Sequence, residues 1–412
     1  MQWADTRGMA FAPQKSELIH FNKGRQQWTN QLNLAQPEGG ISSVKPTASA
    51  RFLGVWLDWR LNWKAHQRAV ERKLKTQSYA LSRIAAKTWG LGLARAREVY
   101  TKCIRSALAY GASSFHTPTK KGGKPATKGI TKALGKAQNK SLRIVAGAFK
   151  ATPIRNLEAE TWVPPLDLYL NKRLADFEVR LQQPVLDDGQ GGKKAPMSIV
   201  HTACNKIHSR YNPRKRRRRR GRQRAFGPQR PTTVEEAAIT IAHWTRGSAD
   251  TDKVVEEAWR ERWLEGREGR ATTRLADSFD HQRETLFNDK TLKRHKGLTK
   301  AESSLLVQIR TGAIGLRDFL YKRRVPEVLT SRCECGEGRE TAEHLVVWCL
   351  APPLTRRWER AEIRTQRDFY STLQGISPAA ARLTRRILGW LMDSGRLPMY
   401  GLARRLELES VV

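Results

Sequence analysis

Apolar and polar residues alternate near the start of the chain. Residues 16–21 (SELIHF) alternate, and residues 52–57 (FLGVWL) form a short apolar run. The stretch between them is interrupted by Pro37, Gly39, Gly40 and Pro46. Alternation favours a strand, whereas clustered Pro and Gly favour a loop. We therefore expect short β structure, with a loop inside it, over residues 1–62.

From Trp63 onward, the apolar residues recur with a helical period. Apolar positions at steps of three and four residues predict helices. The first helix presents Val70, Leu74, Leu81 and Ile84. The second presents Ala96, Val99, Tyr100, Cys103, Ile104, Ala107 and Leu108. The third presents Leu134, Ala137, Ser141, Ile144 and Ala148, and the fourth Leu166, Leu170, Leu174, Phe177 and Leu181. We expect a small helical bundle with basic outer faces over residues 63–183, and a core position for Cys103.

Residues 184–231 differ from the helices on either side. They hold several glycines and then seven consecutive cations, Arg214, Lys215, Arg216, Arg217, Arg218, Arg219 and Arg220. Like charges at this density cannot pack, so a disordered connector is expected. The run is interpreted as a nuclear import signal, as an RNA-binding arm or as a solvated linker, and the first two interpretations can coexist.

The remaining chain, residues 232–412, is predicted to be helical, with structure resuming near Val234. Thr299 and Glu302 have the spacing of a capping box, and Gly312 supplies a stop. A later helix is expected to begin at Ser377 and Pro378 and to end at Gly395, with Leu383, Ile387 and Leu391 on its apolar face. The predicted fold class is thus mainly α with a short N-terminal β segment.

Charge narrows the set of partners. Among 412 residues there are 76 Lys and Arg against 39 Asp and Glu, a formal net charge of +37. Nucleic acid is the expected partner, and an acidic membrane surface is the alternative. No stretch approaches the ~18 apolar residues of a membrane span, and no signal peptide is recognised. The arginine run favours the nucleus, and a mitochondrial location is the alternative because the first fifteen residues hold one acid, Asp5.

One group of residues has the chemistry of a metal site. Cys333, Cys335, His344 and Cys349 form a C-x-C-x8-H-x4-C pattern. Thiolates and imidazole suit Zn²⁺, and four protein ligands leave no open position, so a structural zinc site is expected. The alternative is that these side chains only fill a small core. The one-residue gap departs from the usual C-x2-C finger.

Tryptophans lie close to cations in the sequence, at positions 56, 59, 63, 259 and 263. Such rings can stack on bases, but packing in the core is the favoured interpretation. The acidic pair Asp187 and Asp188 lies in a Gly-rich loop and is interpreted as a solvated turn, because a two-metal site needs carboxylates on rigid elements.

Several longer motifs share an order with a known family. They are residues 8–21 (GMAFAPQKSELIHF), 52–66 (FLGVWLDWRLNWKAH), 88–118, 138–174, and 298–326 followed by the Cys/His pattern. The chain resembles the part that comes after the catalytic core in reverse transcriptases of non-long-terminal-repeat retrotransposons, with the fungal type as the closest match. The resemblance implies a palm edge, a thumb and a zinc-knuckle tail, with RNA or DNA in a template–primer duplex as the partner.

The resemblance also implies roles for individual residues. Lys15 matches the lysine that closes the palm, which implies a proton donor to the leaving pyrophosphate. Phe52, Leu53 and Gly54 match the primer-grip turn, where a glycine lets the backbone approach the primer closely.

Parts of the family pattern are missing. The aspartates that bind the catalytic metal ions in this family would lie before Met1, so Mg²⁺ is expected only in a complete parent enzyme. The acidic residues of the ribonuclease H domain that many relatives carry are also not found. We therefore expect a truncated reverse transcriptase that binds nucleic acid without extending a primer. One alternative is an independent zinc-knuckle RNA- or DNA-binding protein, and another is a fragment that does not fold stably.

Overall fold

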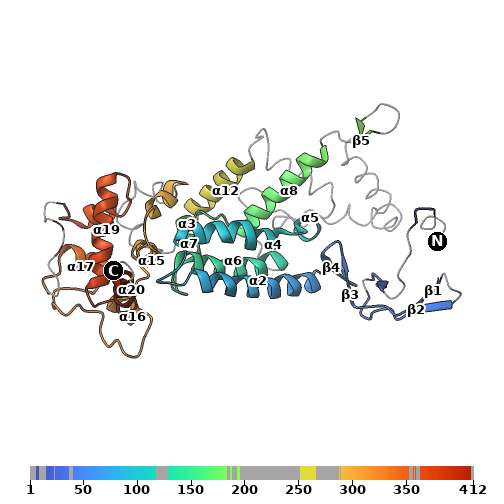
Figure 1. Ribbon diagram of the computed structural model, residues 1–412, viewed down its shortest axis with the longest axis horizontal. Helices are drawn as coiled ribbons and strands as arrows, with labels where there is room; N and C mark the ends of the chain where they lie inside the picture. The colour runs from blue at the N-terminus through green and yellow to red at the C-terminus, as the bar shows by residue number, and fades with distance from the viewer. Residues whose placement is uncertain are drawn as a thin grey trace, which may run out of the picture.

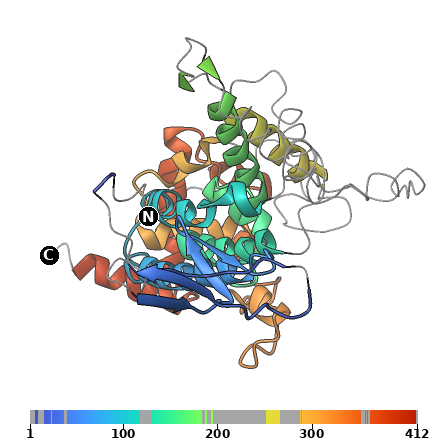
Figure 2. The ribbon, with the colours of Figure 1, turned by 90° about the vertical axis from the view of Figure 1, so that its right-hand side faces the viewer.

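The computed structural model describes residues 6–8, 15–22, 24–36, 40–116, 129–182, 186–187, 193–194, 251–265, 287, 289–351, 356, 358 and 362–409. The fold is mainly helical with a short N-terminal β segment, as predicted. Figure 1 shows the β hairpins, a helical bundle and the C-terminal helices in a row along the longest axis. Seen along that axis, the hairpins lie in front of the bundle (Figure 2).

Two antiparallel hairpins make up the β segment. Strand β1 (Leu32–Gln36) pairs with β2 (Gly40–Val44), and β3 (Ser49–Phe52) pairs with β4 (Val55–Asp58). The expected strand at residues 16–21 is wrong, since only Leu18 pairs, in a single bridge to Pro46. The stretch expected as a loop instead holds β1 and β2. Of the Pro and Gly residues that the structure describes there, Gly40 begins β2 and Pro46 lies beyond its end, so neither interrupts a strand.

Helix α2 (Lys64–Ile84) starts the bundle and packs against β4 and α6 (Ile130–Ala146). Val70, Leu74 and Leu81 are buried as expected. Ile84 is 46% exposed, so its predicted core position is wrong. It is the last residue of α2, and neighbouring elements do not cover its side chain fully.

The second predicted helix is interrupted by a wider turn. It consists of α3 (Leu93–Val99), the π-helical turn η2 (Tyr100–Ile104) and α4 (Arg105–Ala109). A π turn adds a residue to the helix and rotates the helical face beyond it. Cys103 is consequently exposed and not in the core, whereas Arg105 is buried with its guanidinium 3.8 Å from the ring centre of Tyr169. The prediction for Cys103 was wrong because it assumed an uninterrupted helical period.

The bundle is completed by α5 (Ala112–Phe115), α6, α7 (Ile154–Thr161) and α8 (Leu166–Gln182). Their buried apolar side chains form one core, and its most deeply buried large side chains are Tyr100, Leu74, Leu81, Leu93, Leu108, Leu134, Leu142, Leu157 and Leu170. Of the faces predicted for the third and fourth helices, this core contains Leu134, Ala148, Leu166 and Leu170. Phe177 is 39% exposed, so its predicted place on the buried face is wrong.

Helix α12 (Thr251–Glu265) packs against α8. Trp259 and Trp263 are buried beside Phe287, and the Trp259 and Trp162 ring centres are 4.9 Å apart. The core interpretation of these two tryptophans is therefore confirmed. Of the predicted connector, the structure describes beyond α8 only β5 (Leu186–Asp187) and β6 (Lys193–Lys194), which pair antiparallel. The expected restart near Val234, the seven-cation run and Asp188 lie outside the described residues.

The C-terminal region consists of η5 (Asp289–His295), α15 (Lys300–Arg310), α16 (Arg317–Lys322), α17 (Ala342–Val347), α18 (Gln366–Thr372), α19 (Pro378–Asp393) and α20 (Pro398–Glu409). The predicted capping box is confirmed, because the Thr299 hydroxyl accepts from the Glu302 amide and the Glu302 carboxylate accepts from the Thr299 amide. The predicted start of α19 is also confirmed, with Ser377 as the cap and Pro378 as the first helical residue.

Helix α15 joins the bundle to the C-terminal core. Val307 packs in the bundle core, while Leu305, Leu306 and Ile309 belong to the C-terminal core. Lys300 donates from Nζ to the Val145 carbonyl at 2.7 Å, a favourable place for a cation because α6 ends there. Gly147, at φ +62°, lets this helix end approach α15, since a Cβ there would lie 1.9 Å from Ser304 Oγ.

Candidate metal centre and nucleic-acid interface

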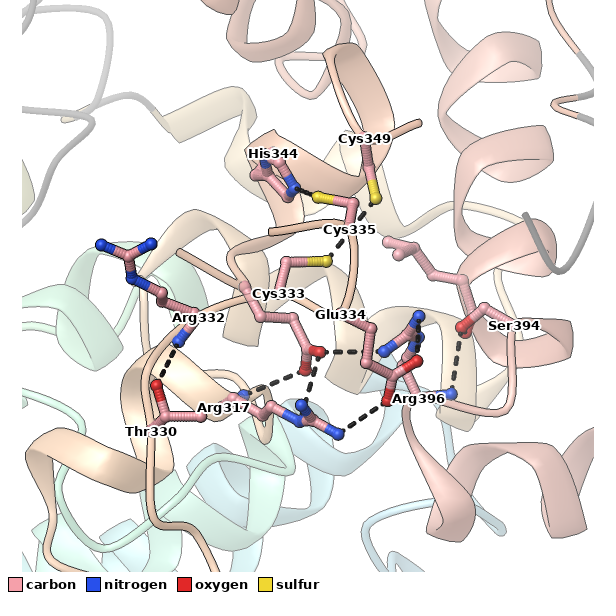
Figure 3. Close-up of polar contacts among 12 residues, drawn as sticks. Arg317, Thr330, Arg332, Cys333, Glu334, Cys335, His344, Cys349, Ser394 and Arg396 are labelled. Atoms are coloured by element: carbon pink, nitrogen blue, oxygen red, sulfur yellow. Dashed lines mark hydrogen bonds and ion pairs between the residues drawn. The ribbon is translucent and has the colours of Figure 1, made fainter. Parts of the chain in front are cut away.

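Cys333 and Cys335 lie on a tight loop between α16 and α17. The Cys333 amide donates to the Gly338 carbonyl at 2.7 Å, and the Gly336 amide donates to the Cys333 carbonyl at 3.0 Å. These two bonds close the loop on itself and direct both thiols to one side (Figure 3). The C-x-C pair therefore lies on a tight turn, the knuckle.

His344 and Cys349 come from the other side of the site. Thr341 caps α17 by accepting from the His344 amide at 3.2 Å, which places the imidazole in the first turn. Cys349 lies just past the end of this helix, not within its first turns, and its amide donates to the His344 carbonyl at 2.8 Å. One short helix thus sets the spacing of two ligands.

The four ligand atoms converge. They all lie within 4.8 Å of one another. The sulfurs of Cys333 and Cys349 are 3.6 Å apart, and Cys335 Sγ is 3.1 Å from His344 Nε2. Tetrahedral Zn²⁺ with Zn–S bonds of about 2.3 Å separates two sulfurs by about 3.8 Å. The residues present therefore fit a Cys₃His metal site.

The pKa values of the Cys333 and His344 side chains without metal are compatible with metal binding. Burial raises the pKa of Cys333 to about 12, so the metal-free thiol keeps its proton at neutral pH. Burial, followed by the charge of Arg356, lowers the pKa of His344, so its imidazole is neutral at pH 7. Metal binding must therefore displace thiol protons, and the neutral imidazole is ready to coordinate.

Ion pairs attach the knuckle to the rest of the C-terminal region. Glu334, between the two cysteines, accepts from Arg317 at 2.6 Å and from Arg396 at 2.8 Å. Glu340 accepts from Arg396 at 3.1 Å. The four side chains are thus compatible with a zinc site, and these ion pairs connect their loop to α16 and to the segment just after α19.

The predicted primer-grip residues form the turn between β3 and β4. Leu53 and Gly54 both have positive φ, 46° and 83°, the geometry of a two-residue hairpin turn. Tyr110 Oη donates to the Leu53 carbonyl at 2.7 Å, and a Cβ on Gly54 would lie 2.8 Å from that Oη. Phe52 and Leu53 are 63% and 78% exposed. The turn is thus held by the bundle and presents apolar side chains outward.

Lys15 is exposed and lies two residues before Glu17, which contacts this hairpin. Glu17 accepts from the Arg51 amide on β3 at 3.2 Å. The structure therefore brings the Lys15 segment alongside β3. It does not place Lys15 near the Cys/His cluster, which belongs to the C-terminal region.

A cationic stripe lies along the outward face of α2. It consists of Lys64, Arg68, Arg72, Lys75 and Arg83, with exposed Tyr79 among them. Steps of three and four residues align these side chains opposite the buried face. The stripe extends about 28 Å at 1.5 Å per residue. The helix has one acid, Glu71, which bonds Gln67 at 3.0 Å.

Among the described residues, only the Cys/His cluster gathers three or more metal-ligating side chains. No helix in that same part of the chain is long and apolar enough to cross a membrane. In comparisons with known proteins, no family model, no curated protein and no solved structure matches the chain.

Proposed function

We propose that the chain is a nucleic-acid-binding part of a reverse transcriptase of the non-long-terminal-repeat type, which holds a template–primer duplex without extending it. The single observation that carries the binding proposal is the cationic stripe on α2. It offers five cations along about 28 Å, close to one duplex turn of roughly 34 Å. Such a surface contacts phosphates and reads no sequence.

The turn at Phe52, Leu53 and Gly54 supports the more specific part of the proposal. The turn connects β3 to β4, and β4 packs against α2. Helix α2 therefore supports the turn and also carries the stripe. A backbone turn with a glycine and exposed apolar side chains suits close contact with a strand end. The motif resemblance assigns that contact to the primer.

The Cys/His cluster is proposed to bind one structural Zn²⁺. Three thiolates and one imidazole are soft and borderline ligands that favour zinc over magnesium or calcium. The ion would hold the knuckle loop and α17 together. It would take no part in chemistry, because none of its coordination positions is open to a substrate.

A second candidate function is an independent zinc-knuckle RNA- or DNA-binding protein. The observation that favours it is the knuckle itself, whose anchoring to Arg317 and Arg396 depends on nothing outside the C-terminal region. The two candidates differ in where nucleic acid makes contact. The first requires the α2 stripe and the β3–β4 turn, whereas the second requires neither.

The test is a binding titration of a labelled 20-base-pair RNA–DNA duplex at several salt concentrations. The variant Arg68→Gln/Arg72→Gln/Lys75→Gln should lose roughly tenfold or more in affinity, with a salt slope smaller by about 2 to 3. The matched control is Arg95→Gln/Lys102→Gln/Arg173→Gln, three exposed cations of the same bundle outside the stripe. Equal losses in both variants would contradict the proposal.

A further inference from the structure

A second basic surface lies in the C-terminal region, away from the α2 stripe. A cavity of about 470 Å³ is bounded by η5, α15, α19 and α20. Seven of its lining residues are Lys or Arg, and none of the described lining residues is acidic. Like charges repel one another, and a cleft lined by charges of one sign attracts ions of the opposite sign.

The sequence of α19 explains how the cations reach one space. Arg382, Arg385 and Arg386 lie three and four residues apart, so they share one face of the helix. Gly389 continues that face without a side chain. The opposite wall comes from η5 and the residue directly after it, through Lys293, Arg294 and Lys296.

Some of the cations are held in fixed positions. Arg294 donates to the Gln374 carbonyl at 2.9 Å, to the Gln374 side chain at 2.8 Å and to Thr291 at 2.7 Å. Burial, followed by the charge of Arg310, lowers the pKa of Arg294 to about 9. Arg386 pairs with Glu362 at 3.3 Å, and Arg404 lies 3.7 Å from Asp393. The guanidinium groups of these three arginines therefore already have partners in the protein.

Three other cations remain available to a ligand. Lys293, Lys296 and Arg382 are exposed and line the cavity. Within the described part of the chain, their side chains make no hydrogen bond or ion pair. Of the three leucines that line the cavity, Leu298 is half-buried, and Leu306 and Leu373 are fully buried. The surface open to a ligand is therefore mainly cationic, and a ligand that carries phosphate groups would pair with these three cations.

We propose that this cavity binds the phosphate backbone of single-stranded nucleic acid, such as an unpaired extension of the template. Its volume is in the range of about 300 to 1,000 Å³ that holds a small ligand, which admits a nucleotide or two and not a duplex. Backbone phosphates would contact Lys293, Lys296 and Arg382. This proposal rests on the proposed function, because it adds a single-strand site to a duplex-binding protein.

The same phosphate chemistry is present in free polyphosphates. The two sources are distinguished by two probes, a labelled 20-nucleotide single strand of DNA or RNA and inorganic tripolyphosphate. A backbone site binds the strand, with tripolyphosphate competing only weakly. A site for free polyphosphate would bind tripolyphosphate through the cavity cations. The affinity for the single strand would then not depend on these cations.

The experiment compares two triple variants of the full chain. The variant Lys293→Gln/Lys296→Gln/Arg382→Gln removes the three cavity cations that make no ion pair, so folding should be retained and is checked by circular dichroism. The matched control, Arg324→Gln/Arg364→Gln/Arg405→Gln, removes three exposed cations of the same region outside the cavity. Affinity for the single strand is measured by anisotropy between 50 and 200 mM salt.

The cavity variant is expected to lose roughly tenfold in single-strand affinity, with a salt slope smaller by about 2, at about 0.7 per phosphate contact. The control should lose less than threefold. Equal losses would overturn the cavity proposal while leaving the proposed function intact, provided duplex binding still depends on the α2 stripe. Loss of tripolyphosphate binding alone would overturn the backbone assignment. A full chain that binds no nucleic acid would overturn both proposals.

Discussion

Arg310 and Glu160 form a buried ion pair that joins the helical bundle to the C-terminal region. Arg310 Nε lies 2.8 Å from Oε1 and 3.0 Å from Oε2 of Glu160. The Arg310 side chain is fully buried, and that of Glu160 is 8% exposed. One partner is on α15 and the other on α7, so the pair fixes how the two parts of the chain are packed.

Removing one partner of this pair should destabilise the fold strongly. Arg310→Met leaves the Glu160 carboxylate buried without its cation, at a cost of about 3 to 5 kcal/mol. The double variant Arg310→Met/Glu160→Met should recover much of that loss, because no charge is left buried. Urea unfolding of the four proteins gives the coupling energy. Additive losses in the double variant would show that the pair contributes little.

The metal centre predicts about one zinc per chain, measured by elemental analysis of protein purified under reducing conditions. Cys333→Ala or His344→Ala should release the ion and increase hydrogen exchange in α17, since the knuckle and this helix are held by the same metal. Cys103→Ala is the matched control, because Cys103 is an exposed cysteine outside the cluster. Zinc-free protein that keeps full protection in α17 would contradict a structural metal.

The buried Glu158 carboxyl predicts a pH-dependent stability. Burial, and next the charge of Asp167, raises the pKa of Glu158 from 4.5 to about 8. Between these values the folded state keeps a proton that the unfolded state has lost, so the free energy of unfolding falls as pH rises. Glu158→Gln should remove up to about 1.4 kcal/mol per pH unit of that decline.

Urea unfolding at pH 5 to 8 measures this slope in the native chain and the variant. Glu257→Gln, an exposed carboxyl on α12, is the control and should leave the slope unchanged. If Glu158→Gln has the same slope as the native chain, the carboxyl is not protonated in the folded state.

The proposed function predicts no primer extension. Phosphoryl transfer onto a primer needs two divalent ions held by carboxylates, and a lysine such as Lys15 cannot ligate Mg²⁺. An assay with an RNA template, four deoxynucleotides and Mg²⁺ or Mn²⁺ should give no incorporation above a no-protein control. Incorporation that is abolished by changing acidic residues of this chain would contradict the proposal.

Features with a local cause could be predicted from the sequence. The capping box at Thr299 and the start of α19 at Ser377 each depend on residues within one helical turn. The ligand spacing at the Cys/His cluster is equally local, because one loop and one short helix set it. These features are independent of distant contacts, so the spacing of residues along the chain is enough to find them.

Features that depend on tertiary contacts or on a local irregularity could not be predicted. The π turn η2 shifts the helical register, which exposes Cys103 and buries Arg105 against Tyr169. No apolar periodicity signals such a turn. The pair of Arg310 and Glu160 joins residues 150 positions apart, and the basic cavity combines η5 with α19. Such contacts between distant residues depend on how whole helices pack against one another.

We propose that this chain holds the primer strand at the β3–β4 turn, and crosslinking from the primer 3′ end detects that contact. A primer with a photoreactive thymidine at its 3′ terminus, annealed to an RNA template, is irradiated with the protein, and the labelled peptides are identified by mass spectrometry. We expect labelling at residues 52–55, with a primer labelled at its 5′ end as the control that does not reach this turn. Labelling confined to the C-terminal region, with none in the hairpins, would contradict the reverse-transcriptase account and favour the independent zinc-knuckle protein.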